Sequence, residues 1–169
     1  MPMDRVQQLI DEVEAAQSDE RWKLDTLVDL EHDRDPRVVA FLLRVLSNSS
    51  EGNAVRLAVL RSRVLAHEYR DHLATVLVRL ANDKSSGDAD TRAQVARALG
   101  DFADSDPAVL ALGALALDES EPLDVRYSAF TSLERAGPTR ECIAVLRLLL
   151  GDETLGRSAR GMLAWWRVD

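Results

Sequence analysis

The chain has 169 residues, of which 46% are hydrophobic and 30% are charged, and this balance excludes a disordered, collagen-like or disulfide-rich protein. Its net charge of −8 argues against general nucleic-acid binding, because domains that contact phosphates are usually basic. The single cysteine, Cys142, favours a reducing compartment, and its apolar neighbours predict a buried thiol. The longest apolar run, 107–117, is shorter than the ~20 residues that cross a bilayer, and no signal-peptide core follows the first residues. We therefore expect a cytoplasmic protein without a membrane segment.

Helical periodicity begins at the N-terminus. Val6, Ile10 and Val13 recur at the spacing of one helical face, and Asp4 precedes them as an N-cap. This pattern predicts a capping helix over residues 5–17 with a polar side toward water.

A helical hairpin is expected next, over residues 19–50, because one apolar pattern runs through 22–30 and another through 38–46. Asp35 and Pro36 mark the start of its second helix, since aspartate accepts free backbone N–H groups and proline suits the first helical turn.

A five-residue motif then recurs along the chain, which indicates an internal repeat. Its four copies are 55–59, 91–95, 125–129 and 155–159, and their fifth residues are 36, 34 and 30 residues apart. The first three copies are followed by a second apolar helix, predicted over 69–81, 107–117 and 138–150. One domain of repeated units is therefore predicted, with units at about 19–50, 51–86, 87–120, 121–152 and 153–169.

These motifs resemble HEAT-like repeats, in particular those of the phycobiliprotein (bilin) lyases. The likeness rests on Leu-x-Asp, a polar turn, Val-Arg-x-x-Ala and a later leucine, which here are Leu117, Asp118, Val125, Arg126, Ala129 and Leu133. It implies an all-α fold, namely a right-handed α-α superhelix (solenoid) of four to five helical hairpins behind the capping helix. Lys23 and Gly156 replace the motif arginine in the first and last units, where capping repeats are expected to be atypical.

No motif for catalysis, a metal or a cofactor stands out. His67 and His72 are five residues apart, whereas a helical zinc site needs histidines at i and i+4. The small number of histidines argues against the di-iron hydroxylases among related helical repeats, and the acidic charge argues against the alkylpurine DNA glycosylases. We therefore predict no catalytic residue, no metal and no cofactor.

The predicted helix over 107–117 carries no polar side chain on any face. Its two apolar stripes are Ala108, Ala111 and Leu115, and Val109, Leu112 and Ala116, and the sequence does not decide which is outward. We expect either that neighbouring segments of the chain cover the outward face of this helix or that a partner protein covers it. A similar choice concerns Trp165 and Trp166, which are interpreted as closing the last interface rather than as an exposed platform.

We expect a non-catalytic module that binds another protein on the concave groove lined by the second helices. The predicted contacts are Arg37, Arg44, Arg70, Arg79, Leu110, Leu112, Leu115, Arg140 and Glu141. Acidic clusters within 29–35 and 101–106 favour a basic partner, and a homodimer through 107–117 is also considered. Two alternatives stay open: a lyase-like protein that handles a bilin chromophore and a phycobiliprotein, as the resemblance implies, and an immunity-type inhibitor of a basic toxin, by analogy of fold.

Overall fold

The computed structural model describes residues 4–16, 19–33 and 35–168, and all regular elements in these residues are helices. The α-helices are α1 (Arg5–Ala15), α2 (Glu20–Glu31), α3 (Pro36–Ser47), α4 (Asn53–Leu60), α5 (Arg63–Glu68), α6 (Arg70–Asn82), α7 (Ala89–Leu99), α8 (Asp106–Leu117), α9 (Leu123–Leu133), α10 (Arg140–Leu149) and α11 (Gly156–Trp165). The short 3-10 helices η1 (Gly100–Phe102) and η2 (Glu134–Ala136) follow α7 and α9 directly. The predicted all-α class is confirmed for the described residues, and none of their helices has the length and apolar character needed to span a bilayer.

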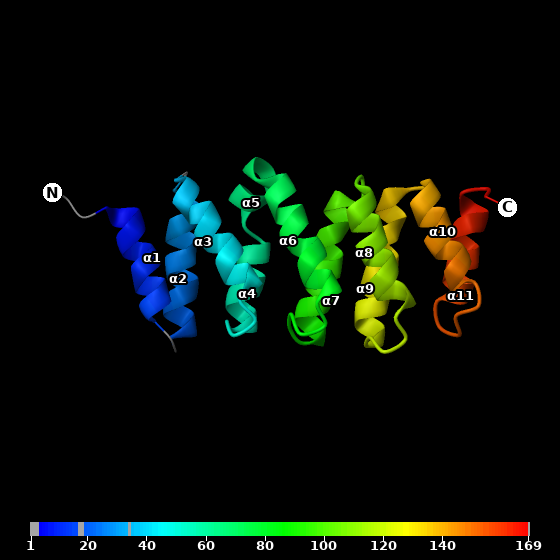
Figure 1. Ribbon diagram of the computed structural model, residues 1–169, viewed down its shortest axis with the longest axis horizontal. Helices are drawn as coiled ribbons and strands as arrows, with labels where there is room; N and C mark the ends of the chain where they lie inside the picture. Colours follow the sequence, from blue (N-terminus) through cyan, green and yellow to red (C-terminus); the bar gives the residue numbers. More distant parts are fainter. Residues whose placement is uncertain (1–3, 17–18, 34, 169) are drawn as a thin grey trace. The chain divides into compact units, whose positions relative to one another are not determined.

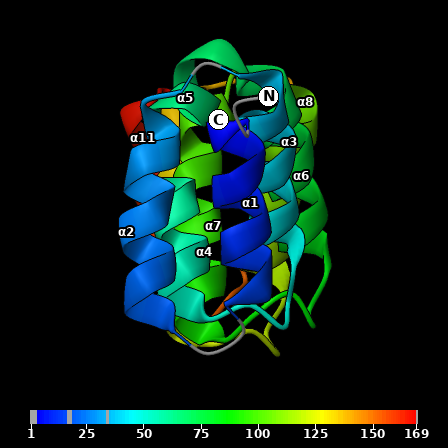
Figure 2. The ribbon, with the colours of Figure 1, turned by 90° about the vertical axis from the view of Figure 1, so that its left-hand side faces the viewer.

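The chain divides into two compact units, Met1–Val76 (unit 1) and Leu77–Asp169 (unit 2), with the boundary inside α6. In unit 1, α1 packs against α2 and α3, and α4 packs against the same two helices (Figure 2). In unit 2, α7 packs chiefly against α9, while α8 packs against both α9 and α10 (Figure 1). The first helices α7 and α9 of unit 2 therefore form one layer, and the second helices α8 and α10 form the other.

Four helices begin within one residue of the predicted start, namely α1, α3, α6 and α8. The side chains of Asp35 and Asp88 accept backbone N–H groups at the starts of α3 and α7. Pro36 is the first residue of α3, but α10 begins two residues after Pro138 because the hydroxyl of Thr139 accepts the N–H of Cys142 instead. The predicted capping helix ends at Ala15, and residue 17 lies outside the described residues.

The predicted unit over 51–86 has a broken first helix. Its helix α4 ends at Leu60, and a separate helix, α5, begins at Arg63. At the equivalent place, the other units carry Leu99, Leu133 and Leu163, which are all buried. Because a charged side chain is rarely buried without a partner, the chain leaves the helical path before Arg63, and this side chain is exposed.

The last predicted unit, 153–169, contains α11 alone among its described residues. Trp165 does not close an apolar interface, because 70% of its surface is exposed, and Trp166 is half-buried. The spacing explains this result: α11 buries Ala159 and Leu163, and a residue two positions beyond Leu163 points to the opposite side of the helix.

A buried cation occupies the second position of the repeated motif in several copies. The Nε groups of Arg56 and Arg126 donate to the carbonyls of Leu46 and Ala116, each over 3.0 Å. Arg92 reaches the carbonyl of Ala81 through Nη2 over 3.4 Å. Leu46, Ala81 and Ala116 are the penultimate residues of α3, α6 and α8. Each arginine thus satisfies a carbonyl that the end of a helix leaves without an intrahelical partner.

Two of these arginines also bind carboxylates in the turn before the next first helix. Arg92 forms a buried ion pair with Glu121, and Arg126 forms one with Asp152. Lys23 binds Glu51 over 2.8 Å in the same way. Lys23 is sufficient at this position because its ammonium only has to bind one carboxylate as a point charge. The guanidinium groups of Arg92 and Arg126 bind a carbonyl and a carboxylate at the same time.

The last copy of the motif has no room for a side chain at this position. A Cβ atom on Gly156 would lie 2.7 Å from the carbonyl oxygen of Leu150 and 3.0 Å from that of Leu149. Local contacts therefore explain why Lys23 replaces the motif arginine in the first unit and why Gly156 replaces it in the last.

Candidate functional site

The second helices of unit 2, α8 and α10, approach each other closely. A Cβ atom on Gly113 of α8 would lie 2.5 Å from Cγ2 of Val145 on α10. The absence of a side chain at Gly113 therefore lets the two helices pack side by side (Figure 1). The buried Arg126 links the two helices, because it binds the carbonyl of Ala116 near the end of α8 and the carboxylate of Asp152 just after α10.

The outward side of this pair carries a stripe of exposed residues on each helix, which together we call the α8–α10 surface. On α8 the stripe comprises Asp106, Leu110 and Ala114, and on α10 it comprises Arg140, Ala144 and Leu148. The exposed Arg147, which interacts with another residue, lies on the same side of α10. Leu110 is 57% exposed and Leu148 is 69% exposed. Leu110, Ala114, Ala144 and Leu148 therefore form an apolar patch, Asp106 and Arg140 lie at the starts of the two helices, and the already engaged Arg147 lies next to Leu148.

Two of the apolar contacts predicted from sequence do not belong to this surface. Leu112 is fully buried and Leu115 is only 4% exposed. Both predicted stripes of the helix over 107–117 face inward, because α8 packs against α7, α9 and α10 and needs apolar side chains on a wide arc. Leu110 is the predicted leucine that remains outside.

The predicted polar contacts fall in different places. Arg140 is exposed and Glu141 is half-buried at the start of α10, and both belong to unit 2, as Leu110 does. The boundary inside α6 assigns the half-buried Arg70 to unit 1 and the exposed Arg79 to unit 2. Arg37 and Arg44 belong to α3 of unit 1.

The arginines of α3 are engaged within unit 1. Arg37 binds Asp35 over 2.5 Å and Asp4 over 2.6 Å, and Arg44 binds Glu14 over 2.5 Å. The Arg37 guanidinium lowers the pKa of Asp35 to about 2, and Asp35 in turn raises the pKa of Arg37 above its usual value. These charges therefore neutralise each other, which also removes part of the acidic cluster predicted over 29–35.

The acidic cluster over 101–106 is also partly neutralised. Asp101 forms an exposed ion pair with Arg135, which lies in η2. Asp106 takes part in no ion pair with any residue that the structure describes, and the same holds for Arg140. The two charges of the α8–α10 surface are thus available to a partner.

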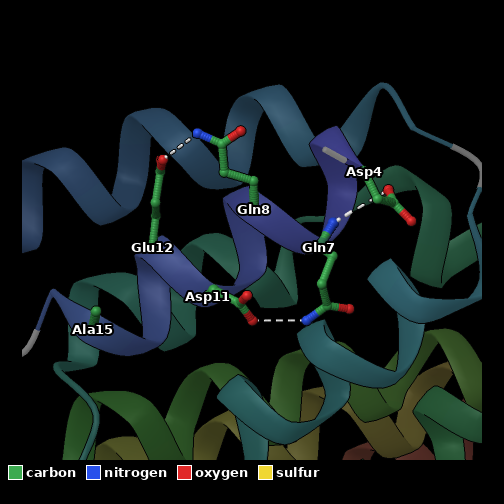
Figure 3. A pocket seen from close by; sticks show the side chains of 6 residues that line it. All are labelled: Asp4, Gln7, Gln8, Asp11, Glu12 and Ala15. Atoms are coloured by element: carbon green, nitrogen blue, oxygen red, sulfur yellow. Dashed lines mark hydrogen bonds between the residues drawn. The ribbon is translucent and has the colours of Figure 1, made fainter. Parts of the chain in front are cut away.

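A second feature is a cavity of about 430 Å³ on the outer side of α1 (Figure 3). The described residues that line it are Asp4, Gln7, Gln8, Asp11, Glu12 and Ala15, all on α1 or its N-cap. Gln7 donates to Asp11 over 2.7 Å, and Gln8 donates to Glu12 over 2.9 Å. These two pairs satisfy each other's polar groups along a single helix, on the side opposite the buried Val6, Ile10 and Val13.

The described residues contain no group of three or more histidine, cysteine or acidic side chains that would hold a metal ion. Cys142 is buried, its Sγ lies 3.4 Å from the carbonyl oxygen of Leu133, and burial raises the pKa of its thiol to about 11. A thiol with this pKa is a poor nucleophile, since the thiolate is the reactive form.

Three residues of the α8–α10 surface escaped the sequence reasoning, namely Ala114, Ala144 and Leu148. They follow the repeat, because the stripes of α8 and α10 correspond at a separation of 34 residues (106 and 140, 110 and 144, 114 and 148). The second and third copies of the motif, 91–95 and 125–129, are also 34 residues apart, so this repeat period could have identified the three residues.

Comparison of the chain with protein-family models, with curated proteins and with solved structures finds no match.

Proposed function

We propose that this chain is a HEAT-like repeat protein that binds another protein through the second helices of its units, with the α8–α10 surface as a contact. The observation that carries the proposal is the exposure of Leu110 and Leu148 on adjacent helices, with Ala114 and Ala144 beside them. Contiguous exposed apolar surface on a folded domain usually marks an interaction site. Burying a leucine side chain yields about 1.5–3 kcal/mol, so covering both would contribute substantially to binding.

The repeat assignment is supported by the buried cations. Arg56, Arg92 and Arg126 occupy the same position in three copies of the motif, and each reaches the penultimate carbonyl of the preceding second helix. A recurring contact of this kind couples each hairpin to its neighbour, as the additive stability of stacked repeats requires. In the solenoid that we propose, these second helices line the binding groove.

The test compares three purified, tagged proteins as affinity baits in a lysate of the source cells. The wild type should retain a stoichiometric protein partner, and the double variant L110D/L148D should lose it, because two carboxylates would then have to be buried at the contact. The matched control is V28D, which places the same charge on an exposed aliphatic residue of α2 in unit 1.

V28D should retain the partner as the wild type does. Equal retention by all three baits, or a specific partner for none of them, would refute the proposed binding surface.

A further inference from the structure

The two stripes of the α8–α10 surface are level with each other. Helices α8 and α10 run in the same direction, because the antiparallel α9 connects them (Figure 1). Gly113 of α8 lies against Val145 of α10. A residue of α8 and a residue of α10 therefore lie at the same height along the two helices when they are about 32–34 positions apart in sequence. The pairs at each level are Asp106 with Arg140, Leu110 with Ala144, and Ala114 with Leu148.

Each of these pairs joins unlike partners. At the first level an acid on α8 corresponds to a base on α10. At the second level a leucine on α8 corresponds to an alanine on α10, and at the third level the order is reversed. The α8 half of the surface is thus complementary to the α10 half in both charge and size.

We propose that the occupant of this surface is a second copy of the same chain. A twofold axis that lies in the interface and runs parallel to the helices would place α8 of each copy against α10 of the other. In such an isologous contact every pair occurs twice, so Asp106 meets Arg140 of the partner subunit on both sides of the axis. Leu110 then packs on the partner's Ala144, and Leu148 packs on the partner's Ala114.

The charges favour this occupant over a strongly basic or a strongly acidic protein. Asp106 and Arg140 are both exposed, and neither forms an ion pair within the part of the chain that the structure describes. A partner of one sign would satisfy one of them and oppose the other, whereas a second copy satisfies both. This inference rests on the proposed function, because it names the protein that the α8–α10 surface binds.

The contact should be weak. A helix of 12 residues is about 18 Å long, and two helices about 10 Å apart present roughly 350 Å² to a partner. Stable complexes bury about 800 Å² per partner, so we expect a dissociation constant of roughly 10 µM to 1 mM.

The experiment is sedimentation equilibrium on the purified full chain from about 10 µM to about 1 mM, which covers the expected range of dissociation constants. The wild type should form a dimer as the concentration rises. D106R and R140D should each raise the dissociation constant about tenfold or more, because each places like charges opposite one another twice. Circular dichroism of each variant should match the wild type, since both side chains are exposed at helix starts.

The decisive sample is an equimolar mixture of D106R and R140D. Each variant supplies the charge that the other lacks, so the mixture should form a heterodimer with the affinity of the wild-type dimer. V28D serves as the control and should associate as the wild type does.

A wild-type chain that stays monomeric up to about 1 mM would overturn the inference, and so would a mixture that associates no better than its components. Either result leaves the proposed function standing if the L110D/L148D bait still loses a different protein from the lysate. A monomeric chain whose baits also retain no specific partner would refute both proposals.

Discussion

The outer helix pairs of the two units are joined by different means. In unit 1, α1 and α3 are linked by Arg37 with Asp4 and by Arg44 with Glu14, and these side chains are about half exposed. In unit 2, α8 and α10 are linked by the close approach at Gly113 and by the buried Arg126 beneath them. Exposed ion pairs contribute little to stability, whereas breaking a buried pair is costly.

The comparison shows how the same kind of helix pair can serve two purposes. The exposed charges of the α1–α3 pair form ion pairs with one another, so they are neutralised within unit 1. The α8–α10 pair places its ionic link in the interior, and its outward residues are left for a partner. We therefore expect substitutions beneath the α8–α10 pair to have large effects and those on the α1–α3 surface to have small ones.

The largest effect is expected for R126A. It leaves Asp152 with most of its surface buried and without its guanidinium, and it removes the donor to the carbonyl of Ala116. The free energy of unfolding should fall by about 3–5 kcal/mol in urea titrations. The Cys142 thiol, which is buried in α10, should also react faster with a thiol reagent because α10 opens more often.

The control for this prediction is R126K. It keeps a positive charge for Asp152 but lacks the fork that reaches a carbonyl as well, as Lys23 illustrates in the first unit. We expect a loss of about 1–2 kcal/mol. If R126A costs less than about 1 kcal/mol, the buried pair does not hold the α8–α10 pair together.

The close approach of α8 and α10 is tested by G113A. The added methyl group would lie 2.5 Å from Cγ2 of Val145, a β-branched side chain that moves little. Because this strain exceeds the gain in helix propensity, the free energy of unfolding should fall by about 1–2 kcal/mol.

The matched control is G161A on α11, where nothing lies within 4 Å of the added Cβ. This variant should gain about 0.5–1 kcal/mol, since alanine favours a helix over glycine. Thermal unfolding of the two variants should therefore shift in opposite directions. A gain in both would show that α8 and α10 can separate without cost.

Acid pH should affect a surface ion pair of unit 2 in a defined window. The Lys84 ammonium, 2.6 Å from Asp118, lowers the pKa of that carboxyl to about 2 with help from Ser120. A lowered carboxyl pKa adds stability that is complete above the ordinary value of 3.8 and is lost as the pH falls toward about 2.

The melting temperature of the wild type should therefore fall in this window, and that of D118N should fall less steeply. N48D, which adds a carboxyl in an exposed turn of unit 1, should not flatten the curve. Parallel curves for D118N and the wild type would show that the pair with Lys84 has no part in acid stability.

Much of the fold could be predicted from the sequence because it depends on local rules. Asp35 with Pro36 marked a helix start, and the apolar spacing of Val6, Ile10 and Val13 marked a buried face. The charged Arg63 at an otherwise apolar position was the sign of the broken helix, and the spacing from Leu163 was the sign that Trp165 is exposed.

The outward face of α8 could not be predicted in this way. Every residue from Ala108 to Leu117 is apolar or glycine, so no polar side chain marks the exposed side. The position of Leu110 outside and Leu112 inside is determined by the packing of α8 against α9 and α10, which the pattern within α8 does not show. The engagement of Arg44 by Glu14 likewise depends on the packing of α1 on α3.

The smallest effect is expected for R44A, which removes the exposed pair with Glu14 and the contact of the guanidinium with the Phe41 ring. The free energy of unfolding should change by about 0–0.5 kcal/mol, because an exposed pair gains little Coulomb energy in water and is screened by salt. The reactivity of Cys142, in unit 2, should stay at the wild-type value. A loss comparable with that of R126A would mean that surface charge holds the α1–α3 pair as firmly as a buried arginine holds α8 and α10, and the contrast between the two pairs would then fail.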